Sequence, residues 1–461
     1  MSAERLIFGG LLLLLFWAPL PLASESVVAG GLLAFGLTGL LALLLMLKTR
    51  ESFELQSHRW DQLVRAWPAL LALVGFLMLL ILQTLPFTNG PVSVDPHRTL
   101  FQIMLTLGYI SGFVLVLLLV NSANRMRQLG MVLVISGLFQ AILAIVLTST
   151  KARYSVAFFP LDHASHALGS FGYRNSLANY LLISISVGIG LVLANLGFSQ
   201  AKAQSAKEVA ARMLHFLLSP AMLLRIMLVV MVVALVMTRS RMGNAGLLIT
   251  LLLVGLPILF FTGRIRRRGL VLIASILVID VVIVGSMIGL DRVVERLNET
   301  PIQVQGPDHQ AQGFSQESLE TRSGPAALVL GMVAERPLLG FGAGSFYTAF
   351  PRFSASEFTG FYDHAHNDYA QFAAETGLVG LGLLAIFLLA SIARALRVVA
   401  RPHSATDFGV ALGALLALGA VLAHATVDFH FQMPAIALTV VAVIAMVWAA
   451  RIQGQTNDLS L

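Results

Sequence analysis

The chain has 461 residues, of which 57% are hydrophobic and 11% charged, with a mean hydropathy of +0.85 and a formal net charge of +7. Soluble globular proteins carry about 25% charged residues, so this composition excludes a soluble protein and indicates an integral membrane protein. No basic stripe carries interleaved aromatic residues, which argues against nucleic-acid binding, and the absence of Cys excludes disulfides and thiolate metal sites.

The hydrophobic segments predict an all-α protein with about twelve transmembrane helices, because about 20 apolar residues cross the hydrocarbon layer. The predicted spans cover residues 6–22, 27–47, 68–85, 101–120, 128–148, 175–197, 222–238, 243–262, 269–290, 372–391, 406–424 and 433–450. The first span also fits a signal peptide, and we favour a retained helix. The whole chain, residues 1–461, is expected to form a single polytopic membrane domain.

The basic residues predict the orientation of these spans. The cluster Arg264 to Arg268 is typical of a cytoplasmic loop, and placing it inside fixes every other loop by alternation. Both termini are then cytoplasmic, and the long polar segment 291–371 lies on the outer face. Asp280 falls in the middle of the ninth span, where an ionisable residue is either functional or held by a neighbouring helix.

Four polar elements are predicted on the same outer face. They are residues 169–175, residues 238–241, the segment 291–371 and residues 424–430. Basic residues on this face oppose the usual orientation bias, so an anionic ligand there would explain them.

Three arginines stand in the first two elements. Arg174 precedes Asn175, a good N-cap residue, and an arginine beside a helix N-terminus suits phosphate binding. Arg239 and Arg241 occupy a short hairpin between two spans, and only one of them needs to be functional. The structural alternative for all three is contact with lipid headgroups.

The segment 291–371 is most informative at its end. Glycines alternate at 340, 342 and 344, a pattern typical of backbone passing close to a glycan or another helix. Asp368 and Gln371 fit a capping arrangement that opens the tenth span. His364 and His366 precede this cap at the water boundary, where an imidazole can accept a proton near neutral pH.

Further ionisable residues are expected near this segment. Glu375 falls just inside the membrane boundary, where its carboxylate could orient an arginine or a histidine. The His-Ala-His sequence could be read as a metal site, but two histidines two residues apart are a weak signal without a third ligand. His424, Asp428 and His430 are expected to line the same outer cavity.

Several sequence blocks resemble the O-antigen ligase and O-antigen polymerase superfamily, membrane enzymes that move lipid-linked glycans on the periplasmic side of the inner membrane. The blocks are Gly169-Ser170-Phe171, Arg174-Asn175, Asn179-Tyr180-Leu181, Ser240-Arg241, Arg336-Pro337-Leu338-Leu339-Gly340 with Gly342 and Gly344, His366-Asn367-Asp368-Tyr369, Glu375-Thr376-Gly377 and Gly380. They cover residues 165–390. The most specific is the last group, which begins at His366-Asn367-Asp368-Tyr369 and continues to Gly380.

The resemblance implies transfer of an undecaprenyl-diphosphate-linked glycan without a cofactor or a metal ion. The family's arginines correspond to Arg174 and Arg241, which would balance the charge of the diphosphate leaving group. The family's loop histidine corresponds to His366, which would orient or deprotonate the acceptor hydroxyl for inverting attack, and His364 could share that role. The remaining predicted substrate-binding residues are Arg239, Arg336, Asn367 and Glu375.

The sequence leaves the acceptor open. A ligase would use a lipid A core sugar, whereas a polymerase would use the end sugar of a growing lipid-linked glycan, and a protein-glycosylating relative is a further possibility. We favour the ligase-like interpretation. The protein is expected to lie in the bacterial inner membrane, in contact with membrane lipids.

A transporter is the alternative from another class of protein. Transporters place polar residues near the bilayer midplane, whereas here they gather at one face.

Overall fold

The structure is a computed structural model of the whole chain. It describes residues 3–48, 57–87, 90–156, 166–195, 220–262, 269–276, 278, 328–353 and 363–454. The basic cluster 264–268, Asp280 and most of the predicted span 269–290 lie outside the described residues.

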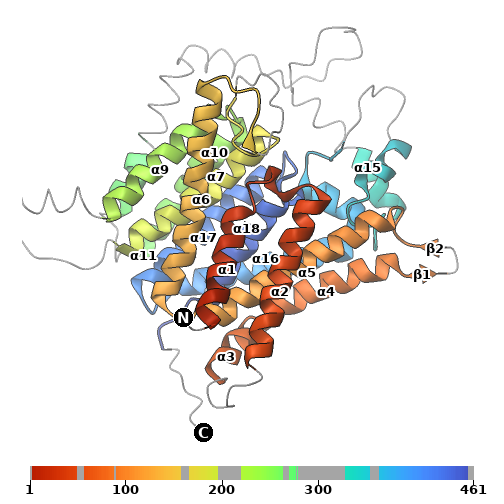
Figure 1. Cartoon of the computed structure of the whole chain (residues 1–461), viewed down its shortest axis with the longest axis horizontal. Helices are drawn as coiled ribbons and strands as arrows, with labels where there is room; N and C mark the ends of the chain where they lie inside the picture. The colour runs from red at the N-terminus through yellow and green to blue at the C-terminus, as the bar shows by residue number, and fades with distance from the viewer. Residues whose placement is uncertain are drawn as a thin grey trace, which may run out of the picture.

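The described residues form a bundle of helices (Figure 1). The long helices are α1 (Ala3–Trp17), α2 (Val27–Lys48), α4 (Trp67–Thr84), α5 (Pro96–Leu119), α6 (Ala123–Ser149), α7 (Arg174–Asn195), α9 (Pro220–Met237), α10 (Arg241–Thr250), α16 (Asp368–Ala400), α17 (Ala405–His424) and α18 (Pro434–Ala449). The short elements are η1 (Leu22–Ser24), α3 (Ser57–Arg65), η4 (Leu251–Gly255), α11 (Leu256–Thr262), α15 (Phe346–Ala349), η5 (Phe350–Arg352), η6 (His430–Gln432) and an antiparallel pair of two-residue strands, β1 (Pro86–Phe87) and β2 (Gly90–Pro91).

The predicted all-α membrane architecture is confirmed. Within the described ranges, eight helices are long and apolar enough to cross a membrane, with α10, η4 and α11 counted as one continuous helix. Helices α9 and α18 are also apolar, but their apolar stretches are shorter than those of the eight. The number of spans in the whole chain, about twelve by the sequence window, stays a prediction.

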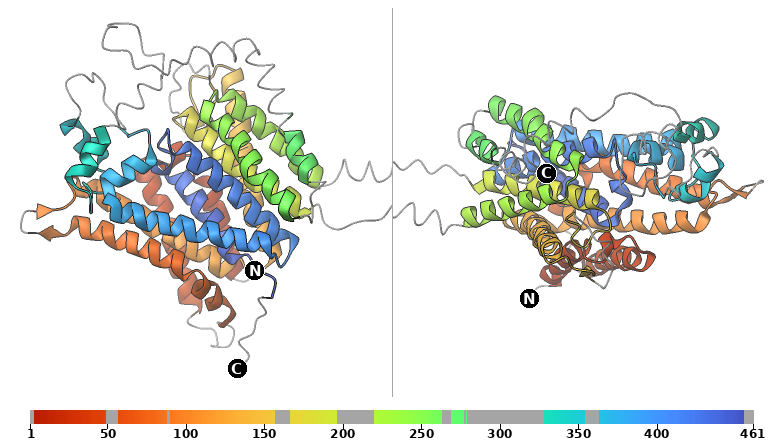
Figure 2. Two further views of the ribbon diagram at one scale, coloured as in Figure 1. Left: turned by 180° about the vertical axis from the view of Figure 1, so that it is seen from behind. Right: turned by 90° about the horizontal axis from the view of Figure 1, so that it is seen from above.

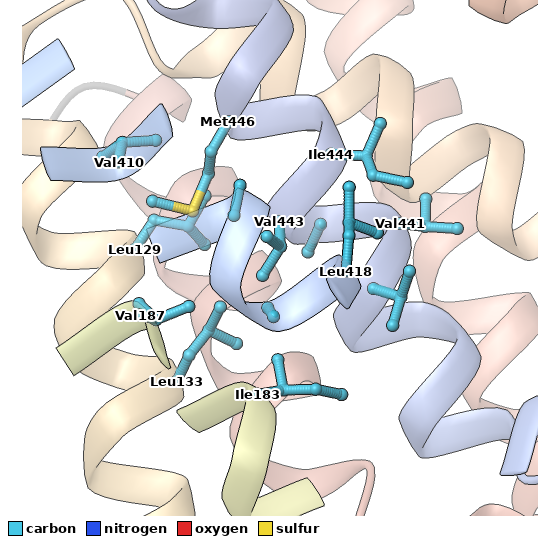
Figure 3. Close-up of a cluster of buried hydrophobic side chains, with 14 of the residues drawn as sticks. Leu129, Leu133, Ile183, Val187, Val410, Leu418, Val441, Val443, Ile444 and Met446 are labelled. Atoms are coloured by element: carbon cyan, nitrogen blue, oxygen red, sulfur yellow. The ribbon is translucent and has the colours of Figure 1, made fainter. Parts of the chain in front are cut away.

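Helices α7, α17 and α18 form the centre of the bundle. Helix α7 is buried along its entire apolar stretch, and a Cβ at Gly190 would lie 2.2 Å from the carbonyl oxygen of Gly409 on α17. The two backbones therefore touch, as small residues allow between membrane helices. Figure 3 shows a cluster of aliphatic side chains from α6, α7, α17 and α18, among them Leu133, Ile183 and Leu418.

The helices alternate in direction and so gather their connections at two ends of the bundle. One end is marked by the ion pair of Glu4 with Arg125 and by Arg451, whose Nη2 donates to the Asn121 carbonyl at 3.3 Å. At the opposite end the Ala167 N–H donates to the Met237 carbonyl at 3.1 Å. Figures 1 and 2 show α15 at this second end, away from α3. The starts of α7, α10 and α16 meet there with the end of α17.

Helix α16 is interrupted at Gly377, whose φ of 66° and ψ of −178° are not helical. The segment 337–342 fills the interruption: the Leu378 N–H donates to the Pro337 carbonyl at 2.7 Å, and the Phe341 N–H donates to the Ala374 carbonyl at 2.9 Å. A Cβ at Gly340 would lie 2.5 Å from the Glu375 backbone. The close approach expected from the alternating glycines is thus an approach to a helix.

Candidate functional site

The short segment before α16 carries the predicted histidines. Asn367 has extended backbone and caps the helix, since its Oδ1 accepts from the Ala370 N–H at 3.0 Å. Its side-chain amide also donates to the Thr426 carbonyl at 3.0 Å. The sequence expectation that Asp368 and Gln371 form the cap was wrong: Asp368 is the first helical residue and accepts from the Phe431 N–H at 3.1 Å. Both residues therefore tie α16 to the turn after α17.

His366 lies against Asp428 in that turn. The Nδ1 atom of His366 is 3.5 Å from Oδ1 of Asp428, and its ring edge packs on Phe429 at 5.0 Å between centroids. Nδ1 is buried, yet 28% of the side chain is exposed, so the exposed surface belongs to other atoms of the side chain. The backbone of His366 has a φ of 49°, a conformation that non-glycine residues seldom adopt outside turns and functional sites.

Asp428 also connects this segment to α7. Its Oδ2 accepts from the side-chain amide of Asn175 at 2.6 Å. Helix α7 begins at Arg174, one residue before Asn175. Asn175 is therefore not the N-cap that the sequence suggested. The Nη1 atom of Arg174 lies 3.0 Å from Nε2 of His166. One buried carboxylate thus joins the candidate base to the helix end that carries Arg174.

Arg239 and Arg241 lie in the hairpin between α9 and α10. Ser240 caps α10 by accepting from the Gly243 N–H at 3.1 Å, and Arg241 is the first helical residue. A Cβ at Gly243 would lie 2.8 Å from the Cβ of Ala178, so the start of α10 rests on the first turns of α7. Two helix N-termini, each opened by an arginine, are therefore neighbours. Such ends attract anions through their free N–H groups and partial positive charge.

Glu375 holds the glycine-rich segment, residues 335–346, to α16. Its Oε2 accepts from the Gly344 N–H at 2.9 Å, and its Oε1 accepts from the Phe346 N–H at 3.2 Å and from the Gln371 amide at 3.1 Å. The same amide lies 3.2 Å from Nδ1 of His364. The carboxylate thus reaches a histidine through an intervening glutamine, and its direct contacts are mainly with loop backbone.

His364 packs flat on Phe429, with ring centroids 4.1 Å apart. Burial lowers the pKa of His364 to about 4, against the opposing effects of Asp363 and of the bond to Gln371. The ring is therefore neutral near pH 7. This environment suits a packing residue better than a proton acceptor.

Arg336 fastens the glycine-rich segment to the strand pair. Its Nη1 donates to the Val92 carbonyl at 2.8 Å, and its guanidinium lies 4.5 Å from the Phe341 ring centroid. These contacts give Arg336 a structural explanation. Substrate binding by Arg336 stays a prediction.

An apolar cavity begins beside the start of α16 and extends between α4, α5, α16, α17 and α18. The polar residues that line it are Gln102, Thr106, Asp368, Glu375 and Gln432. Apolar side chains line the remainder, among them Phe76, Leu80, Phe372, Leu384, Leu388 and Val440. A cavity of this kind suits a long hydrocarbon chain whose polar end lies near α16.

Sequence reasoning placed Asp428 on the outer cavity but missed its contact with His366. The sequence feature that could have indicated this contact is a carboxylate shortly after an apolar span, where an ionisable residue often has a functional partner. In the same turn, His424 and His430 lie with Asp428 in the one group of three possible metal ligands found among the described residues. The two histidines of the His-Ala-His sequence are not in that group.

Residues 226–385 match the model of the family described as O-antigen ligase. The matched range contains His366, Glu375 and the arginines at 239, 241 and 336, and it excludes Arg174 and Asp428. A comparison with curated proteins found no match. The family match confirms the resemblance inferred from the sequence blocks.

Proposed function

We propose that this chain, a member of the O-antigen ligase and polymerase superfamily, transfers an undecaprenyl-diphosphate-linked glycan to an acceptor hydroxyl at the periplasmic face of the bacterial inner membrane. Transfer of lipid-linked glycans is the general activity of that superfamily. The finer assignment is ligase-like, with a lipid A core sugar as acceptor. The observation that supports glycan transfer, by a ligase or a polymerase alike, is the His366 and Asp428 contact beside two helix ends opened by arginines.

In the proposed reaction, His366 acts as general base through Nε2, the ring nitrogen that does not face Asp428. The acceptor hydroxyl gives its proton to the imidazole while its oxygen attacks the anomeric carbon. The bond from that carbon to the diphosphate oxygen breaks, and undecaprenyl diphosphate leaves with the electron pair, so the configuration inverts. Asp428 would stabilise the imidazolium, as a carboxylate does for a histidine held at its other nitrogen.

The leaving group needs positive charge as it departs. Arg174 and Arg241 stand at the first positions of adjacent helices, where guanidinium and free backbone N–H groups can act together on phosphate oxygens. Arg239 is close in sequence and exposed, so it is proposed to contact the substrate's periphery. No cofactor is assigned to this chemistry.

The lipid part of the donor requires an apolar site. We assign it to the cavity beside α16, because Phe372, Leu384 and Leu388 line it while Asp368 and Glu375 mark its polar end. An isoprenoid tail lying there would bring its diphosphate toward the end of the bundle that carries His366.

A polymerase would use the same donor and the same groups, and differ only in the acceptor. In the part of the chain that the structure describes, the interruption of α16 at Gly377 favours a transporter, since transporters often bind substrates at broken helices. Here, however, the segment 337–342 fills the interruption. We therefore favour glycan transfer over transport.

The test is a deletion strain whose surface polysaccharide, lipopolysaccharide and lipid-linked glycan pool are compared with those of the complemented strain. Lipid-linked chains of normal length accumulating over bare core would identify a ligase. Single repeats on core, or lost exopolysaccharide, would identify a polymerase. An unchanged glycan profile together with solute flux in proteoliposomes would overturn the proposal in favour of transport.

A further inference from the structure

The turn between α17 and α18 buries an unusual set of side chains. His424, Asp428 and His430 are 1%, 3% and 1% exposed. Each offers one ligand atom, and these atoms all lie within 4.8 Å of one another. The two imidazole rings meet edge to face with centroids 4.1 Å apart. Two imidazoles and a carboxylate, all buried and this close together, form a donor set that one cation could share.

The backbone of this turn is fixed before any ligand binds. The Val427 N–H donates to the His424 carbonyl at 3.1 Å, and the Phe429 N–H donates to Oδ1 of Asp428 at 3.1 Å. From α16, the Asp368 N–H donates to the carbonyls of Ala425 at 3.0 Å and Asp428 at 3.1 Å. The three side chains are thus held on one short, braced segment, so little ordering is needed to bring them onto one ion.

The donor set selects the kind of ion. Imidazole nitrogens suit zinc and the neighbouring transition metals, whereas magnesium and calcium prefer oxygen ligands. Ligand atoms on zinc lie about 2.0–2.2 Å from the metal, so in a tetrahedral site two of them lie about 3.3–3.6 Å apart. The ligand atoms of the three side chains lie within 4.8 Å of one another, so they would have to move together by about 1 Å to coordinate one ion. Three protein ligands would leave one position open for water.

We propose that His424, Asp428 and His430 form a binding site for one divalent transition-metal ion of the zinc class. The site lies outside the range that matches the O-antigen ligase family and does not depend on the proposed glycan transfer. The metal has no step in that transfer. Its effect is to brace the turn that carries Asp428, and through Asp428 the adjacent His366 and Asn175.

The experiment uses the full chain purified in detergent with an affinity tag that contains no histidine. The protein is stripped with a chelator, and Zn²⁺ is titrated against a chromophoric competitor. We expect one equivalent bound per chain, and a rise in unfolding temperature on binding because the ion favours the folded state. His424→Gln and His430→Gln should each weaken binding by at least about tenfold.

His364→Gln is the matched control, because this partly buried histidine packs on Phe429 but is not in the group of three. It should bind Zn²⁺ as the wild type does. Equal Zn²⁺ affinity in all four proteins, or no stoichiometric binding by the wild type, would overturn the proposal.

A second measurement needs no variant and so is independent of their folding. Co²⁺ added to the stripped wild type should give the intense visible bands of a four- or five-coordinate site, and Zn²⁺ should abolish them. A spectrum that stays that of hydrated Co²⁺ would reject the site.

Discussion

The Nδ1 atom of His366 lies 3.5 Å from Oδ1 of Asp428, although helices α16 and α17 separate the two residues along the chain. The contact exists because α16 begins beside the turn in which α17 ends, where the Asp368 N–H donates to the Ala425 carbonyl. A partly exposed histidine with one ring nitrogen facing a carboxylate is an arrangement suited to general base catalysis.

The first prediction concerns this pair. His366→Ala should lower kcat for glycan transfer by about 100- to 10,000-fold, the usual contribution of a general base. Asp428→Asn should lower kcat with little change in KM, because Asp428 acts on the imidazole and not on bound substrate. Asp428→Glu should recover part of the loss. Transfer would be followed with purified protein, lipid-linked donor and acceptor, at matched levels of folded protein. Normal turnover by His366→Ala would exclude it as the base.

The second prediction concerns the two arginines at adjacent helix starts. Arg174→Ala and Arg241→Ala should each reduce kcat by about 100- to 1,000-fold, because a group that stabilises developing charge is lost. Lysine at either position should recover only part of the rate, since an ammonium cannot bind two phosphate oxygens in a fork. Arg98→Ala, in the first turn of α5, is the control for losing an arginine at a helix start. A similar loss in all three alanine variants would point to general destabilisation.

The third prediction tests the apolar cavity. Ala437 on α18 lines it, so Ala437→Trp should occupy space that a lipid tail needs. We expect a higher KM for a donor with a full-length isoprenoid tail and a smaller change for a short-chain analogue. Leu389→Trp on α16 is the control, because Leu389 is 65% exposed and does not line the cavity. If both tryptophan variants handle the two donors alike, the tail binds elsewhere.

For the described residues, the sequence predicted which segments are helical and that the starts of α7, α10 and α16 share one end of the bundle with the end of α17. Hydrophobic length and alternation of direction are local and additive properties. The sequence predicted less well where helices begin. Asn175 and Asp368 are both residue types that cap helices well. The Asn175 amide instead donates to Asp428, and the Asp368 carboxylate accepts from the Phe431 N–H. In each case the side chain forms a hydrogen bond with a segment that is distant in the sequence.

The interruption of α16 shows why other features were missed. Glycine at 377 is compatible with a continuous helix, and only the neighbouring segment 337–342 explains its conformation. Likewise, the partnership of His366 with Asp428 depends on how α16 and α17 pack, which one sequence does not encode in any local pattern.

The fourth prediction is a pH dependence of stability. Burial lowers the pKa of His364 to about 4, with Asp363 and Asp428 opposing the shift and His366 adding to it. The usual pKa is 6.5, so between these values the unfolded chain binds a proton that the folded chain does not. Stability should therefore fall as the pH drops from 6.5 toward 4.

This loss should be shallower in His364→Gln, because the substituted side chain does not titrate. His97→Gln, which removes an exposed histidine, is the control. The measurement is the unfolding temperature in detergent across that pH range. Parallel curves for the wild type and His364→Gln would show that His364 does not contribute.

The fifth prediction compares two glycines of α16. Gly377 has a φ of 66° and a ψ of −178°, a region that essentially only glycine adopts, and a Cβ there would lie 2.1 Å from the Leu338 carbonyl oxygen. Gly377→Ala should therefore destabilise the protein by at least about 1–3 kcal/mol. A Cβ at Gly382 would meet nothing within 4 Å, and Gly382→Ala should stabilise the helix by about 0.5–1 kcal/mol.

The same methyl group thus has opposite expected effects five residues apart, and unfolding temperatures of the two purified variants would test this directly. Gly377→Ala should also reduce glycan transfer, because the segment 337–342 would lose its hydrogen bonds to α16. The adjoining backbone at Gly344, which Glu375 binds, would then shift as well. Unchanged stability in Gly377→Ala would mean that the interruption of α16 does not depend on glycine. Normal stability with lost activity would instead assign the segment a direct part in substrate binding.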